Sequence, residues 1–141
     1  MRRGALVLIA LLSMLPLAGC QASNGAAVPA SGPTSLYVTS SNPERESRPP
    51  PEGVVRDAAT VDQLYRAALA LPVVSERHNC PYDTGQVYGL IFQRGSDVVA
   101  QMELHVSGCR FLYIRGDRAR MTDSAFRALF SKVTGMPLPA R

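Results

Sequence analysis

Two histidines and three cysteines offer the most obvious chemistry in this chain of 141 residues. His78 and Cys80 lie close to Asp83, and all three side-chain types can bind zinc. A closed structural zinc site takes four ligands, and a disulfide through Cys80 would leave too few of them. We therefore expect no metal ion and no cofactor.

Catalysis by a histidine is the second possibility, because His78 or His105 with a serine and an aspartate would suit a hydrolase. Such groups assemble in space, so the sequence leaves this alternative open. However, the chain lacks a nucleophile elbow, an HExxH motif, a P-loop and a GxGxxG motif, and its carboxylates are spread thinly. We expect no catalytic residues and keep a small envelope hydrolase as an alternative.

The N-terminus has the pattern of an export signal. Arg2 and Arg3 precede an apolar run over residues 5–17, and small residues lead from this run to Cys20. A charged start, an apolar run of about 7–15 residues and small residues at its end are typical of a secretory signal peptide. The run is shorter than the roughly 20 apolar residues of a membrane-spanning helix.

The stretch Leu17-Ala18-Gly19-Cys20 resembles the lipobox of bacterial lipoproteins. The resemblance implies that residues 1–19 are removed and that the thiol of Cys20 carries a diacylglycerol. Two acyl chains anchor a protein stably, whereas a single myristoyl chain gives only marginal binding. We therefore expect the mature chain to be held at a lipid bilayer, on the extracytoplasmic side of the bacterial cell envelope.

The expected export of the protein also predicts a disulfide. With Cys20 lipidated, Cys80 and Cys109 remain, and an exported protein matures in an oxidising compartment. An even number of cysteines there favours a bridge, so we predict one between Cys80 and Cys109. Closing a loop of about 30 residues contributes roughly 3–4 kcal/mol in the chain-entropy model.

Residues 20–54 have the composition of a tether. Prolines and serines are frequent and large apolar residues are few, so this segment has little to bury. The exception is Leu36-Tyr37-Val38, for which docking on the domain as an extended strand stays open. We predict a disordered, lipidated tether over residues 20–54 that holds a small domain of residues 55–141 away from the membrane.

Hydrophobic spacing predicts a helix at each end of this domain. The first covers residues 60–71, with Thr60 as its cap and an apolar face formed by Val61, Leu64, Ala68 and Leu71. The second follows a cap at Thr122, carries the apolar stripe of Phe126, Leu129, Phe130 and Val133, and ends at Gly135.

Alternating apolar residues predict three strands between the helices, over residues 86–94, 98–106 and 109–115. The short connections favour an antiparallel meander. The predicted fold is therefore α+β: a two-layer domain of helix, three-stranded antiparallel meander and helix, with one disulfide. We expect both helices on the apolar face of the sheet, although the first strand is apolar on both sides and leaves helices on both faces possible.

The segment 80–135 carries a second resemblance, which rests on these residues: Cys80-Pro81, Asp83, Gly85, Tyr88, Leu90, Phe92, Ser107-Gly108-Cys109-Arg110 and Phe126. With them it is similar to a group of uncharacterised small bacterial lipoproteins. The resemblance implies a fold framed by the two cysteines. It implies no activity, because the group has none assigned.

Charge argues against nucleic acid as a partner. Two of the 15 basic residues, Arg2 and Arg3, lie in the signal segment, so the mature chain has only a small excess over its 11 acidic residues. The remaining basic residues are scattered, without the clustering that binding to phosphate backbones needs.

We expect a monomeric, non-enzymatic binding or structural module whose partner is an envelope protein or a wall polymer. Its candidate binding loop carries Arg77, His78, Tyr82 and Asp83, because loops held by a rigid scaffold commonly bind. An inhibitor of a secreted hydrolase is the alternative within binding proteins.

Overall fold

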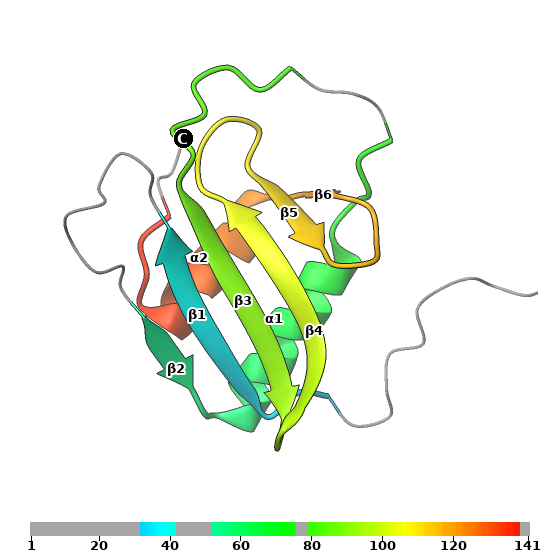
Figure 1. Ribbon diagram of the computed structural model, residues 1–141, viewed down its shortest axis with the longest axis vertical. Coiled ribbons are helices and arrows are strands. Elements are labelled where there is room, and N and C mark those ends of the chain that lie inside the picture. The colour runs from blue at the N-terminus through cyan, green and yellow to red at the C-terminus, as the bar shows by residue number, and fades with distance from the viewer. Residues whose placement is uncertain (1–31, 42–51, 76–78, 139–141) are drawn as a thin grey trace, which may run out of the picture.

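The computed structural model describes residues 32–41, 52–75 and 79–138. Their elements are, in chain order, β1 (Ser35–Ser41), β2 (Gly53–Val55), α1 (Ala58–Ala70), β3 (Val87–Arg94), β4 (Asp97–His105), β5 (Phe111–Ile114), β6 (Arg120–Met121) and α2 (Ser124–Thr134). The strands form one antiparallel sheet in the order β2-β1-β3-β4-β5-β6 (Figure 1). The protein is an α+β domain with one disulfide.

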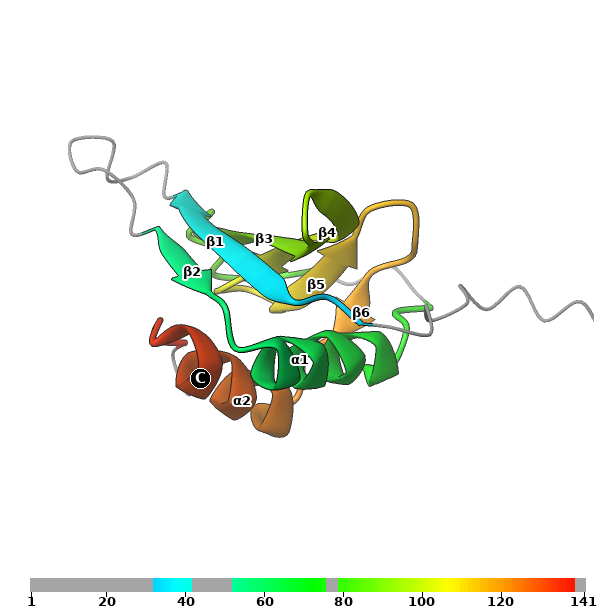
Figure 2. The ribbon, with the colours of Figure 1, turned by 90° about the horizontal axis from the view of Figure 1, so that it is seen from below.

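Both helices lie side by side on the same face of the sheet (Figure 2). The core fills the space between these two layers, and aromatic rings join them. Tyr65 of α1 contacts Phe92 of β3, and Tyr88 of β3 contacts Phe130 of α2, each with ring centroids 5.4 Å apart. Among the described elements, the opposite face of the sheet has no helix packed on it.

Helix α1 begins earlier than the sequence predicted. Its cap is Asp57, whose carboxylate accepts the backbone N–H of Thr60 at 2.8 Å, so the prediction of a cap at Thr60 is wrong. An aspartate in this position satisfies one of the N–H groups that the first turn leaves without a helical partner. The predicted apolar face is confirmed, because Val61, Leu64 and Ala68 are fully buried.

Helix α2 is capped by Asp123, which accepts the N–H of Phe126 at 2.7 Å. The predicted cap, Thr122, instead donates its hydroxyl to the carbonyl of Arg110 at 2.7 Å and ties the helix start to the sheet. Gly135 ends the helix as predicted, with the left-handed φ of 70° that glycine adopts without strain.

The sheet is larger than the three strands that the sequence predicted. Strands β3, β4 and β5 are joined by β1 and β2 on one side and by β6 on the other. The segments β2 and β6 are only 3 and 2 residues long, too short to show a periodic pattern.

The prediction of a tether over residues 20–54 is wrong for β1 and β2. Strand β1 pairs with β3 along its whole length and buries Leu36, Val38 and Ser40 against the helices. The docking that was left open for Leu36-Tyr37-Val38 therefore occurs, and the domain begins before residue 55. Residues 20–31 of the predicted tether, including Cys20, and residues 42–51 lie outside the described residues, as does the signal segment.

Candidate binding face

Within residues 32–41, 52–75 and 79–138, no helix lies on the face of the sheet opposite α1 and α2 (Figure 2). Its side chains follow from the alternation along each strand. On β4, Met102 and Leu104 are buried under the helices, so Gln101, Glu103 and His105 project to the other side. We call this side of the sheet the open face.

Strand register arranges the open face in rows. Thr39 of β1, Gly89 of β3, Glu103 of β4 and Tyr113 of β5 pair in succession across the sheet. A second row joins Tyr37, Ile91 and Gln101, and Arg115 extends it by donating its backbone N–H to the carbonyl of Gln101 at 2.9 Å. Residues distant in sequence therefore form one continuous surface.

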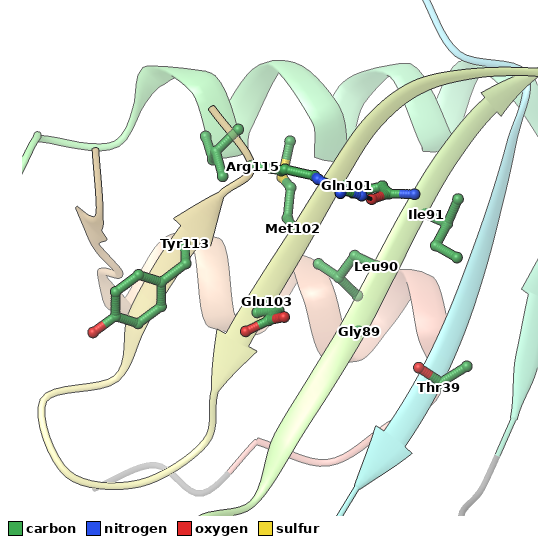
Figure 3. A pocket seen from close by; sticks show the side chains of 10 residues that line it. Thr39, Gly89, Leu90, Ile91, Gln101, Met102, Glu103, Tyr113 and Arg115 are labelled. Atoms are coloured by element: carbon green, nitrogen blue, oxygen red, sulfur yellow. Dashed lines mark hydrogen bonds between the residues drawn. The ribbon is translucent and has the colours of Figure 1, made fainter. Parts of the chain in front are cut away.

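A hollow of about 430 Å³ lies on the open face (Figure 3), and Gly89 is central to it. The space above Gly89 holds only the side chain of Thr39, whose hydroxyl oxygen would lie 2.6 Å from an added Cβ. A glycine inside a strand weakens it and often marks a site that another molecule approaches closely. Here the close neighbour is the Thr39 side chain, which lies over the strand and lines the hollow together with Gly89.

The hollow contains charges of both signs. The guanidinium of Arg115 donates to the side-chain oxygen of Gln101, and Figure 3 shows these two side chains reaching toward each other across β4. Glu103 lies exposed on the neighbouring row. Within the described ranges, its side-chain carboxylate has no hydrogen-bond or ion-pair partner. The hollow thus presents one oriented cation and one carboxylate that is free to accept hydrogen bonds.

A polar cluster borders the open face at the end of β4. The carboxylate of Asp83 accepts the N–H of Gly85 and the hydroxyl of Ser107, each at 2.9 Å, and its other oxygen lies 3.7 Å from Nδ1 of His105. These contacts, the Gly85 N–H first and the Ser107 hydroxyl second, lower the pKa of Asp83 below its ordinary value. The ring of His105 packs on Tyr113 with centroids 4.8 Å apart, which connects the cluster to the hollow.

The disulfide fixes this cluster in place. Cys80 and Cys109 are bonded, as predicted, with their Cα atoms 4.9 Å apart. An added Cβ at Gly108 would meet the Cβ atoms of Asp83 at 3.1 Å and Cys80 at 3.3 Å. Glycine at this position therefore lets the loop before β3 lie directly against the β4–β5 turn.

The structure places the residues of the predicted binding loop in different environments or does not describe them. Arg77 and His78 lie outside the described residues. Tyr82 is 93% exposed with a left-handed φ of 62°, so its ring projects into solvent. Asp83 is turned toward Ser107 and His105 and holds the loop to the sheet, so its carboxylate is engaged within the protein.

The cluster has the residue types of a hydrolytic site without the corresponding hydrogen bonds. In a serine hydrolase the imidazole accepts the proton of the nucleophilic hydroxyl. Here the Ser107 hydroxyl donates to Asp83 and accepts the N–H of Thr84, while His105 faces Asp83. Among the residues that the structure describes, no three His, Cys, Asp or Glu side chains are grouped to hold a metal ion.

The sequence did not identify the hollow. Two local signals were present: a glycine within the alternating pattern of β3, and the polar residues Gln101 and Glu103 on the wet side of β4. Neither signal shows that Thr39 and Tyr113 lie in the same row, because that depends on the pairing of β1 and β5.

Comparisons of the chain with protein-family models, with curated proteins and with solved structures find no match. None of the helices within 32–41, 52–75 and 79–138 combines the length and apolar character needed to cross a bilayer.

Proposed function

We propose that this chain is a cell-envelope lipoprotein, anchored through Cys20, whose domain binds an envelope component without catalysing a reaction. The observation that carries the binding role is the hollow on the open face, which Gly89 and side chains of both charges line and which no helix of the described residues covers. Concave surfaces with a few convergent polar groups are the usual form of ligand sites.

The proposed location in the cell envelope rests on the lipobox-like stretch that ends at Cys20. The disulfide between Cys80 and Cys109 supports it. Disulfides persist in oxidising compartments and are rare in the cytosol. Intact-mass spectrometry of the mature protein tests the anchor: we expect a chain that begins at Cys20 and carries a diacylglycerol. An unmodified Cys20 thiol in that chain would refute lipidation, and a Cys20→Ser variant supplies the unlipidated reference.

Retention on purified envelope fractions tests the binding role. All proteins compared carry Cys20→Ser, so that acyl chains do not hold them on the membrane. Glu103→Arg reverses the charge in the hollow and adds bulk, so we expect it to weaken retention. Gln63→Arg changes an exposed residue on α1, on the other side of the domain, and supplies the matched control. Equal retention of the wild type and both variants would argue against binding through the open face.

A second candidate, an inhibitor of a secreted hydrolase, is favoured by one observation. Tyr82 projects into solvent between Cys80 and Asp83, which the disulfide and the Ser107 hydroxyl tie to the β4–β5 turn. Tyrosine is enriched among residues that dominate protein interfaces. If this candidate holds, Tyr82→Ala abolishes inhibition of envelope hydrolases by the purified protein. Glu103→Arg would then leave inhibition intact, which separates the two candidates.

A further inference from the structure

We propose that the hollow on the open face is a binding site for a neutral saccharide chain, such as the glycan part of an envelope polymer. The inference deepens the proposed function and rests on it, since it names the ligand class of the same surface. It is carried by four features of the hollow: its position in the sheet, its balanced charge, its exposed aromatic ring and its shape.

The position of the hollow restricts the mode of binding. It lies over residues 89–91 of β3 and 101–103 of β4, stretches that have a neighbouring segment on both sides. An extended peptide that joins a sheet requires a free edge, and the hollow offers none. Its ligand is therefore recognised by side chains alone.

The charges of the hollow favour a ligand that is itself uncharged. Arg115, directly after β5, and Glu103 of β4 belong to adjacent rows, so an anion attracted by the guanidinium is repelled by the carboxylate. A sugar hydroxyl both donates and accepts hydrogen bonds. It can donate to Glu103 and accept from Arg115, whereas a ligand that only accepts or only donates satisfies one of them.

The apolar parts of the hollow complete this match. Tyr113 is 42% exposed, and its ring is braced by His105 at 4.8 Å and by Phe111 at 6.2 Å between centroids. Ile91 supplies a second apolar surface on β3. A pyranose ring has an apolar C–H face and a polar rim, so it can pack on the tyrosine while its hydroxyl groups reach the charged pair.

The shape of the hollow favours a chain over a single sugar. It extends from Thr39 on β1 to Tyr113 on β5, three strand spacings of about 4.8 Å, or roughly 14 Å. Gly89 and Glu103 line the hollow between these two residues (Figure 3). Because Arg115 is held by Gln101 before any ligand arrives, binding requires little ordering of the protein.

Calorimetric titration of the mature, lipidated protein in detergent micelles tests the proposal. The probes are neutral tetrasaccharides of glucose and of N-acetylglucosamine, with polyglutamate and polylysine as charged probes. We expect at least one tetrasaccharide to bind, and Tyr113→Ala and Glu103→Gln each to weaken that binding by about tenfold or more. Tyr113→Phe keeps the ring and should retain most of the affinity. Asp97→Asn, at the exposed first residue of β4, is the carboxylate control and should bind like the wild type.

Folding is checked by the melting temperature of each variant. Ile91→Ala removes the second apolar surface of the hollow, so it supplies a second route to the same loss of affinity. Binding of a charged probe alone, tetrasaccharide binding that these variants leave unchanged, or no tetrasaccharide binding by the folded wild type would overturn the inference. If in that case Glu103→Arg still reduces retention on envelope fractions, the open face binds another ligand class, such as a protein, and only the saccharide assignment fails.

Discussion

At the scale of single residues, short polar side chains decide where the elements of this domain begin. Asp57 and Asp123 each accept a backbone N–H three residues later, whereas Thr60 and Thr122, which the sequence favoured, do not cap. Both pairs are good capping types at plausible positions. The choice between them depends on the direction in which the preceding chain arrives, which the local sequence does not contain.

The cap of α2 gives a quantitative prediction. Asp123→Ala removes the acceptor for the Phe126 N–H and should lower the free energy of unfolding by about 1 kcal/mol, whereas Asp123→Asn keeps most of it. Urea denaturation measures both. Asp97→Ala, at the exposed first residue of β4, is the control and should change little. A loss for Asp97→Ala as large as that for Asp123→Ala would contradict the capping account.

Asp83 predicts a dependence on pH. Its pKa lies below the ordinary value of 3.8 because the Gly85 N–H and the Ser107 hydroxyl stabilise the ionised form. A lowered pKa in the folded state means that this stabilisation is complete above the unfolded value and is lost as the pH falls through the folded one. We expect the amide NMR signal of Gly85 to shift on acidification with a midpoint below 3.8, and Asp83→Asn to remove the transition. A midpoint above 3.8 would contradict the hydrogen bonds described here.

At the scale of elements, the sequence predicted the helices and strands whose apolar residues recur at regular spacing. The apolar faces of both helices were visible in their spacing, and β3 and β4 in their alternation. The sequence left β1 open as a strand because only two of its inward residues, Leu36 and Val38, are large and apolar. Prolines and serines surround them. Its identity as a strand comes from pairing with β3, a contact between segments some 50 residues apart that no local pattern records.

Strand β1 therefore provides a test of the revised domain boundary. Leu36→Ala empties a fully buried position and should cost about 2–5 kcal/mol of stability. Tyr37→Ala, one residue later on the open face, should cost much less, because Tyr37 is 37% exposed. Equal, small effects in thermal melts would mean that β1 does not belong to the folded domain.

The disulfide joins the loop before β3 to the turn before β5. It closes a separation of 29 residues, for which the chain-entropy model gives a contribution of roughly 3–4 kcal/mol. We predict that the protein shows no free thiol until it is reduced, and that reduction or a Cys80→Ala, Cys109→Ala double change lowers the melting temperature. Two titratable thiols in the unreduced protein would contradict this.

At the scale of the whole molecule, the domain is asymmetric. Both helices cover one face of the sheet, and the other face carries the hollow and the polar cluster around Asp83 (Figure 2). The sequence placed the binding surface on the loop, because loops are recognisable locally. The open face is assembled by register across β1, β3, β4 and β5, so it becomes visible only once the strands are paired.

The central claim is that the open face meets the envelope ligand, and site-specific photo-crosslinking in intact cells tests it most directly. A photoreactive residue replacing Tyr113 should give adducts with envelope material, while the same residue replacing Gln63 on α1 should give none. Adducts at position 63 without adducts at position 113 would contradict the account.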